Sequence, residues 1–470
     1  MSLPADVAAT LQPGFPGTDV PGWLVRAHAE GLVSVCLYGQ NVTGPDGLAA
    51  LCATLHARMP GVLLAVDEEG GDVTRLHYPT GSPAVGNAVL GRLDDPGRTR
   101  AVAAGIGHEL SELGIGLDLA PDVDVNSSPD NPVIGVRSFG DDPALVARHA
   151  AAWVDGLQST GVAACAKHFP GHGDTVVDSH HGLPRVDVTR EVLEERELAP
   201  FRAAVRAGVA SVMTSHIVVS SIDPHRPATF SRTVIGVLRD ELGFDGVVVS
   251  DALDMAGASA ETGIPEAAVR ALVAGVDLLC LGSGTTRETY DAVHATVLAA
   301  VRSGRLPEGR VSEAAARVRT LATATAERMP RPGTRTDRAP ATLTDESVMR
   351  AFRLSDAARA WLTGPAPAAV VQVGSTANLA VGDVSWGPAA LGATTAEAEV
   401  PTGARVAVVG RAVGVGHPAP AVAERLRAAG HDVVLVECGW PRGGADIETF
   451  GGSPAVAQAL LALLRGEVST

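Results

Sequence analysis

Short apolar runs alternate with longer segments of helical periodicity between residue 30 and about residue 285. The apolar runs are rich in β-branched residues, as is typical of strands buried on both faces of a parallel sheet. The predicted strands cover residues 31–39, 61–67, 116–125, 161–168, 210–216, 246–251 and 276–282. The predicted helices between them include residues 98–113, 142–159 and 191–208. Seven such units favour a (β/α) barrel, with an open doubly wound sheet as the structural alternative.

A second α/β pattern follows this first one. A helical segment at residues 311–329 is followed by residues rich in Pro, Thr and Arg that have no periodicity, which is typical of a linker. Beyond it, apolar runs and helical segments alternate again. We therefore predict a TIM-like (β/α) barrel domain over residues 1–330, a linker over 331–345, and a smaller C-terminal α/β/α sandwich domain over 346–470.

Composition and charge narrow the range of partners. The formal net charge is −16, with 53 acidic and 37 basic residues, so nucleic acid and anionic membrane surfaces are not expected to bind. No long apolar stretch and no basic leader followed by an apolar run is present, which favours the cytoplasm. The five cysteines show no CxxC spacing and are predicted to be buried thiols.

Ionisable residues stand at or just after the ends of the predicted strands. The carboxyl ends of barrel strands, and the loops after them, converge on one mouth. For any single residue, a loop-facing or helix-capping role is the better interpretation, but that interpretation weakens for the whole set. Lys167 is the only lysine of the chain, which draws attention to its compact ammonium group. The set comprises Asp67, Arg137, Lys167, His168, His216 and Asp251.

Residues 167–184, KHFPGHGDTVVDSHHGLP, form a loop with four histidines and two aspartates. A zinc site is one interpretation, with His168, His172, His180 and His181 as ligands beside Asp174 or Asp178. The spacing matches no helical zinc motif, and the adjacent Lys167 would oppose a cation, so no metal is expected. The favoured interpretation is general acid/base catalysis by Asp178 and His180, in which the carboxylate orients the imidazole.

Asp251 is the candidate nucleophile, because it follows the apolar run GVVVS and should be held rigidly at the barrel mouth. Asp254 is the alternative, although a helix-capping role suits it better. A carboxylate that attacks an anomeric carbon forms a glycosyl-enzyme intermediate and leads to net retention. Asp67, Arg75 and Arg137 are suited to orienting sugar hydroxyls, since charged and forked groups form paired hydrogen bonds.

Five segments together resemble the bacterial β-N-acetylglucosaminidases of glycoside hydrolase family 3. They are AVDEEGGDVTRL (65–76), LAPDVDVNSSPDNPVIGVRSFG (119–140), AKHFPGHGDTVVDSHHGLP (166–184), MTSH (213–216) and GFDGVVVSDALDM (243–255). The resemblance spans residues 12 to about 325 and implies a TIM-like barrel. It also implies Asp251 as nucleophile and the dyad Asp178 and His180 as acid/base. The residues expected to bind substrate are Asp67, Arg75, Arg137, Lys167, His168 and His216.

The resemblance implies hydrolysis of terminal, non-reducing β-GlcNAc from cell-wall fragments or chitooligosaccharides, without a cofactor. Phosphorolysis is the alternative within the family, because a neutral histidine repels anions less than a carboxylate does. A non-catalytic sugar sensor and a zinc hydrolase are the alternatives from other classes. A monomer or homodimer is expected. The family's SDDL or SDSL becomes SDAL here, so a polar residue after Asp251 is absent.

Overall fold

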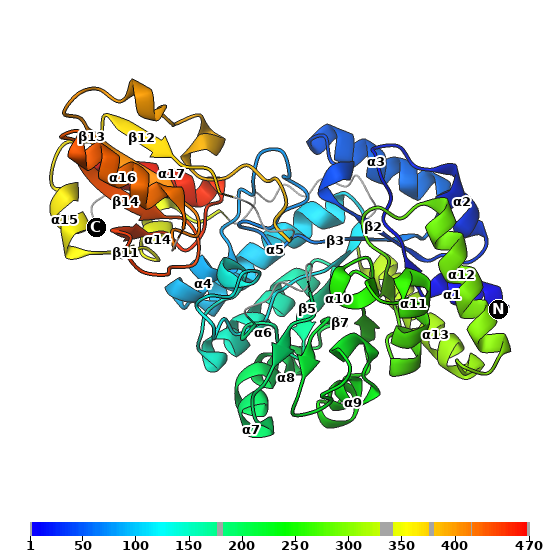
Figure 1. The fold of residues 1–470 in the computed structure, drawn as a ribbon. Helices are drawn as coiled ribbons and strands as arrows, with labels where there is room; N and C mark the ends of the chain where they lie inside the picture. The colour runs from blue at the N-terminus through cyan, green and yellow to red at the C-terminus, as the bar shows by residue number, and fades with distance from the viewer. Residues whose placement is uncertain (1, 176–181, 330–341, 376–379, 415, 468–470) are drawn as a thin grey trace.

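The computed structural model describes residues 2–175, 182–329, 342–375, 380–414 and 416–467. Within these residues, parallel strands of the N-terminal part form a ring enclosed by helices (Figure 1). The strands, in ring order, are β1 (Leu11–Gln12), β2 (Ser34–Leu37), β3 (Leu63–Val66), β4 (Ile115–Asp118), β5 (Ala163–Phe169), β7 (Ser211–Thr214), β9 (Val247–Val249) and β10 (Leu279–Cys280).

Backbone hydrogen bonds close this ring where the regular ladders stop. Ser250 N donates to Leu278 O at 2.9 Å and joins β9 to β10, while Cys36 N donates to Pro13 O at 3.0 Å and joins the β1 segment to β2. The N-terminal part of the chain is therefore an α/β barrel, as the sequence predicted. All seven predicted strands are present, and β1 was missed.

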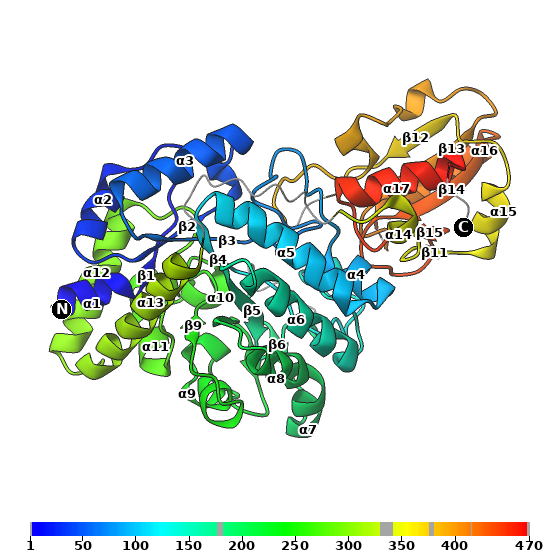
Figure 2. The same ribbon diagram turned by 180° about the vertical axis from the view of Figure 1, so that it is seen from behind.

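Helices follow the strands and cover the outside of the barrel (Figures 1 and 2). The longer ones are α2 (Gly22–Ala29), α3 (Pro45–Arg58), α5 (Pro96–Glu112), α6 (Pro143–Gln158), α8 (Leu198–Arg206), α11 (Gly263–Ala274) and α12 (Arg287–Arg302). The shorter elements are α1 (Leu3–Ala9), α4 (Asn87–Leu93), α7 (Arg190–Val192), α9 (Arg232–Gly236), α10 (Ala256–Ser259), β6 (Arg185–Val186) and β8 (Val218–Val219). Among the described residues, none of the helices combines the length and apolar character needed to cross a lipid bilayer.

The interior of the barrel is packed with apolar side chains, and its amino-terminal end is closed by α13 (Glu308–Arg328). Leu117, Cys165 and Met213 point inward from three strands, and they belong to the same buried cluster as Val318 and Leu321 of α13. All five cysteines are buried free thiols, as predicted. Since one end of the barrel is filled in this way, a ligand can approach only from the carboxyl ends of the strands.

A second sheet forms what we call the C-terminal unit, the described residues between 342 and 467. Its strand order is β11, β15, β14, β13, β12, and only β11 runs antiparallel to its neighbour. Alternate strand residues face α16 on one side and α17 on the other, which makes an α/β/α sandwich. The elements are α14 (Asp345–Met349), β11 (Arg353–Leu354), α15 (Asp356–Leu362), β12 (Ala369–Gln372), β13 (Arg405–Gly410), α16 (Pro418–Ala428), β14 (Asp432–Glu437), β15 (Ile447–Glu448) and α17 (Pro454–Arg465).

The C-terminal unit lies beside the barrel, next to α4 and α5, in both views (Figures 1 and 2). It is attached there to the long loop after β3. Gly452 N donates to Asp72 Oδ1 at 2.9 Å, and Asp383 N donates to the Tyr78 hydroxyl at 2.9 Å. Residues 331–341 of the predicted linker lie outside the described residues, so the domain boundaries at 330 and 346 stay a prediction.

Candidate active site

A cavity of 330 Å³ opens at the carboxyl ends of the barrel strands. Its size suits a small ligand such as a monosaccharide unit. Residues predicted from strand ends and loops in distant parts of the sequence meet in its wall. Those that line it are Asp67, Arg75, Arg137, Lys167, His168 and Asp251.

The centre of this wall is a buried cluster of alternating charges. Lys167 Nζ lies 2.7 Å from Asp67 Oδ1 and 2.7 Å from Glu69 Oε1. Glu69 is also held by Arg137 through two hydrogen bonds, at 2.8 and 3.0 Å. Burial alone would raise the pKa of Glu69, but the two cations hold it well below its usual value. Glu69, Lys167 and Arg137 are therefore charged at neutral pH, and Asp67 is the most exposed member of the cluster, at 19% of its side-chain area.

Glu69 was not identified from the sequence, although it contacts both cations of the cluster. It stands two residues after Asp67 in the DEE segment that follows β3. Its neighbour Glu68 has a structural role, since its Oε2 accepts hydrogen bonds from Thr74 Oγ1, Arg75 N and Leu76 N at 2.8 to 2.9 Å. Asp67 therefore lines the cavity, Glu68 stabilises the loop after β3, and Glu69 contacts the two cations of the cluster.

Arg75 lines the cavity, but its guanidinium is already engaged by the C-terminal unit. It donates to Ala380 O at 2.6 Å and to Val381 O at 3.1 Å. The sequence predicted that Arg75 orients sugar hydroxyls. The structure adds a second role, because this side chain fixes the 380–381 segment against the cavity, where Ala380 is part of the wall.

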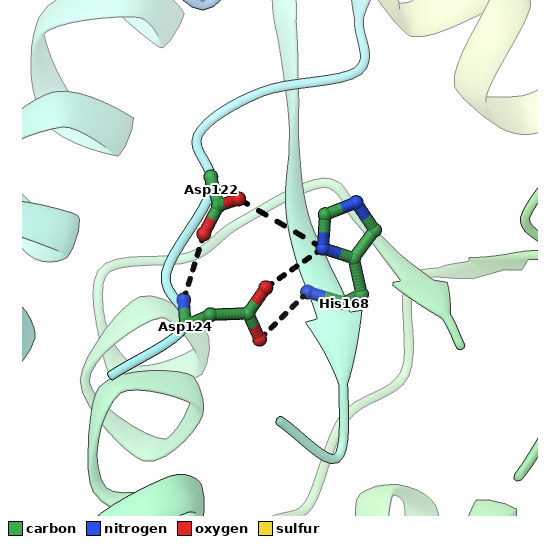
Figure 3. A group of neighbouring side chains, drawn as sticks. All are labelled: Asp122, Asp124 and His168. Carbon is green, nitrogen blue, oxygen red and sulfur yellow. Dashed lines mark hydrogen bonds and ion pairs between the residues drawn. The ribbon is translucent and has the colours of Figure 1, made fainter. Parts of the chain in front are cut away.

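His168 is oriented by two aspartates of the loop after β4 (Figure 3). Its Nδ1–H donates to Asp124 Oδ2 at 2.7 Å, and Nε2 lies 3.2 Å from Arg137 Nη2, which fits a neutral ring that accepts from the guanidinium. Burial, followed by the charge of Arg137, lowers the pKa of His168 to about 4. The ring is therefore neutral under ordinary conditions and presents a fixed tautomer.

Asp122, Asp124 and His168 also have a spacing that could hold a metal ion (Figure 3). However, the Arg137 guanidinium lies 3.5 Å from Asp122 Oδ2, so a fixed positive charge already faces these carboxylates. Burial and the neighbouring Asp124 raise the pKa of Asp122 to about 8, which weakens it as a cation ligand at neutral pH. We interpret the group as the hydrogen-bond network that positions His168.

Asp251 enters the cavity directly after β9. The preceding residue, Ser250, is buried between β9 and β10, where its hydroxyl oxygen accepts from Cys280 N at 3.0 Å. Asp251 Oδ1 in turn accepts from Ala252 N at 2.7 Å. Asp254 lines the same cavity but caps no helix, since α10 begins only at Ala256. The backbone on both sides of Asp251 is thus held in place, as a nucleophile requires.

Asp178 and His180, the predicted acid/base dyad, lie outside the described residues, as does His181. The described residues before them reach the cavity: His172 lines it, and its Nδ1 bonds the Thr175 hydroxyl at 2.7 Å. The role of the dyad stays a prediction.

His216 is not among the residues that line the cavity, and its predicted contact with substrate stays a prediction. It is fully buried, with Nδ1 3.0 Å from Thr229 Oγ1 and Nε2 3.0 Å from Ala252 O. A strand-end histidine can point away from the mouth, and here the ring supports the residue that follows the candidate nucleophile. The geometry therefore suits His216 to positioning the backbone at Ala252.

Replacing His216 by Phe is expected to lower kcat about tenfold while KM changes little, because small displacements of a reacting group are costly. Phe keeps the ring that stacks on Phe230 but loses both hydrogen bonds. Steady-state kinetics on a chromogenic substrate measure the two constants separately. A rise in KM with unchanged kcat would instead support the prediction that His216 contacts the sugar.

The backbone at Gly171, in the loop before the predicted dyad, packs against the side chain of Glu197. The buried carboxyl group of Glu197 predicts that the stability of the protein depends on pH. Glu197 is 1% exposed, and burial raises its pKa to about 7 although Arg196 lies 2.6 Å away. Because the folded-state pKa exceeds the ordinary value of 4.5, stability is greatest below pH 4.5 and falls as the pH rises towards 7. Glu197→Gln should therefore gain melting temperature relative to wild type between pH 5 and pH 8, by about 2 °C. A pH-independent difference would contradict this.

The fold is a (β/α) barrel with a cavity at its mouth, which Asp251 shares with the buried cluster of charged residues. The family model for the glycosyl hydrolase family 3 N terminal domain matches residues 26–321. The chain belongs to this family and is a glycoside hydrolase. The resemblance stated from the five sequence segments is thereby confirmed.

Relatives with known structures or curated names agree. The chain is 36% identical over 315 residues to the beta-hexosaminidase A of Pseudoalteromonas piscicida, which covers 61% of this chain and 52% of that protein. It is 41% identical over 254 residues to a beta-hexosaminidase of Alkalilimnicola ehrlichii, covering 53% and 72%. The solved family 3 β-N-acetylglucosaminidase from Paenibacillus sp. FPU-7 is 30% identical, with a TM-score of 0.85 and coverage of 100% and 98%. The chain thus spans about half the length of the first relative and nearly all of the last.

Proposed function

We propose that this chain is a retaining β-N-acetylglucosaminidase that removes terminal, non-reducing β-GlcNAc residues from cell-wall fragments or chitooligosaccharides. The observation that carries the proposal is the shared cavity, in which Asp251 stands with the ion cluster of Asp67, Glu69, Arg137 and Lys167. We infer the identity of the sugar, GlcNAc, from the names of the relatives.

In the proposed reaction, the ion cluster holds the sugar hydroxyls. Asp67 and Lys167 offer an acceptor and a donor to the ring, and their mutual contact fixes both without substrate. The Asp251 carboxylate then attacks the anomeric carbon and forms a glycosyl ester as the aglycone oxygen leaves.

The leaving oxygen needs a proton, which we assign to His180 with Asp178 behind it. After departure of the aglycone, the neutral imidazole takes a proton from water, whose oxygen attacks the anomeric carbon and releases Asp251. Both steps invert the anomeric centre, so the product keeps the β configuration. Support for this assignment comes from the DSH segment and from His172, which brings the preceding loop to the cavity.

Turnover of p-nitrophenyl β-N-acetylglucosaminide tests the proposal. Release of nitrophenol together with free GlcNAc, initially as the β anomer by NMR, is the expected result. GlcNAc 1-phosphate formed in phosphate buffer would make the enzyme a phosphorylase. No release with or without phosphate would overturn the catalytic proposal. Cytoplasmic residence and a monomeric or homodimeric state also stay predictions, which cell fractionation and sedimentation would check.

A further inference from the structure

A second cavity, of 130 Å³, lies between the barrel and the C-terminal unit. Barrel loop 131–137 forms one side. The residues that follow β12, β13 and β14 form the other, so the carboxyl edge of the second sheet faces the mouth of the barrel. Crevices at the carboxyl ends of parallel strands are common ligand sites.

Two arginines of the C-terminal unit line this second cavity. Arg411 is 12% exposed at its side chain, stacks on Trp386 at 4.5 Å and lies 3.3 Å from Asp72 Oδ2. Its Nε is buried and has no hydrogen-bond acceptor among the described residues. One edge of this guanidinium is therefore paired, while a buried donor remains to be satisfied.

Arg442, the other arginine, is exposed at the rim of the second cavity. Within the part of the chain that the structure describes, its guanidinium has neither a hydrogen bond nor an ion pair. The nearby Glu437 attracts Arg442 electrostatically but does not line the cavity, and its carboxylate already accepts from the backbone N–H groups of Ala412, Val413 and Gly439.

The charges in the wall of the second cavity do not cancel. Among the lining residues, Asp72 contributes the carboxylate. This carboxylate already forms an ion pair with Arg411 and accepts a hydrogen bond from Gly452 N at 2.9 Å. Since Arg442 is a further cation, the cavity carries an excess of positive charge. Guanidinium groups recognise carboxylates and phosphates through forked hydrogen bonds. The expected occupant is therefore a small anionic group.

The second cavity adjoins the catalytic one through a shared wall made of Val133 and Arg137. Asp251 lines only the catalytic cavity. In the orientation that we assign to the sugar, the anomeric carbon faces Asp251 and the opposite edge, with C4 and the exocyclic C6, faces the shared wall at Arg137. In this orientation a substituent on C6, which is exocyclic, extends towards the side where the second cavity lies.

We propose that the interdomain cavity is a subsite for an anionic group, a phosphate monoester or a carboxylate, on C6 of the sugar bound in the catalytic cavity. This inference rests on the proposed function for the orientation of the sugar. It gives the C-terminal unit a role in choosing substrates, with Arg442 and Arg411 as the residues that determine specificity.

Binding to the full chain tests the proposal without turnover. Isothermal titration calorimetry should show that N-acetylglucosamine 6-phosphate, or the matching C6 carboxylate, binds about tenfold more tightly than N-acetylglucosamine. In Arg442→Met the ratio of the two dissociation constants should fall towards one. The matched control is Arg302→Met on α12, an exposed arginine on the far side of the barrel, which should retain the wild-type preference (Figure 1). Equal binding of all three sugars by wild type, or an unchanged preference in Arg442→Met, would overturn the subsite.

Kinetics separate this proposal from the proposed function. The ratio of kcat/KM for the 6-phosphorylated over the plain p-nitrophenyl glycoside should fall about tenfold in Arg442→Met. If wild type cleaves neither glycoside, the glycosidase proposal fails while the binding preference still decides the subsite. Inorganic phosphate that binds without weakening the binding of the 6-phosphate would indicate a separate free-ion site and overturn the substrate subsite.

Discussion

Asp251→Asn is expected to lower kcat for p-nitrophenyl β-N-acetylglucosaminide by at least about 10³-fold, because an amide cannot attack the anomeric carbon. The substitution keeps the shape of the side chain and the hydrogen bond accepted from Ala252 N. Melting temperature should therefore change little, and binding of GlcNAc, measured by calorimetry, should persist. The combination of lost turnover and kept binding identifies a residue that acts in the chemical step.

The matched variant is Asp254→Asn, since this carboxylate lines the same cavity. Its loss of kcat should be far smaller. In Asp251→Ala, added azide should restore cleavage and give a glycosyl azide of the α configuration, because the small anion attacks the face left open by the missing carboxylate. A severe loss in Asp254→Asn together with an active Asp251→Asn would transfer the nucleophile to Asp254.

The barrel was predictable because each buried strand is a short, nearly continuous apolar run. This signal located seven strands, but it overestimated their length where polar residues alternate beyond the strand. β4 ends at Asp118, while the predicted run continued to residue 125. β1 was missed because it has two residues, Leu11 and Gln12, directly before a proline. So short a strand has no periodicity of its own, and it exists because β10 pairs with it.

The candidate site was predictable where position along a strand sets the direction of a side chain. Asp67, Lys167 and Asp251 follow this rule and share one cavity. Glu69 and the engagement of Arg75 could not be found in this way. Their partners lie 68 and 305 residues away along the chain, and only the packing of the C-terminal unit brings Ala380 to Arg75.

The second cavity could not be predicted from the sequence either, because its lining residues come together only in the folded protein. Arg411 and Arg442 belong to a segment without a ligand-binding motif. Their chemistry appears when the carboxyl edge of one sheet is set against the mouth of another. A domain with no motif of its own can thus take part in a site through the surface it presents.

Replacing Lys167 by Met is expected to lower kcat/KM about 100-fold or more and to destabilise the protein by about 3 to 5 kcal/mol. The ammonium is 2% exposed at its side chain and contacts Asp67 and Glu69, so its loss leaves the Asp67 carboxylate without its cation beside Glu69, which keeps only Arg137. Kinetics on the chromogenic substrate and urea unfolding measure the two effects. Lys167→Arg should also lose activity, because a planar fork replaces an ammonium held at 2.7 Å from both oxygens.

The double variant Lys167→Met with Glu69→Gln separates the two roles of the lysine. Neutralising Glu69 removes the repulsion between its carboxylate and that of Asp67, so part of the lost stability should return. Activity should not return, because the donor that faces the sugar is still missing. If Lys167→Met kept kcat/KM within about threefold of wild type while losing stability, the ammonium would be confined to holding the cluster together, and hydroxyl binding would fall to Asp67 and Arg137.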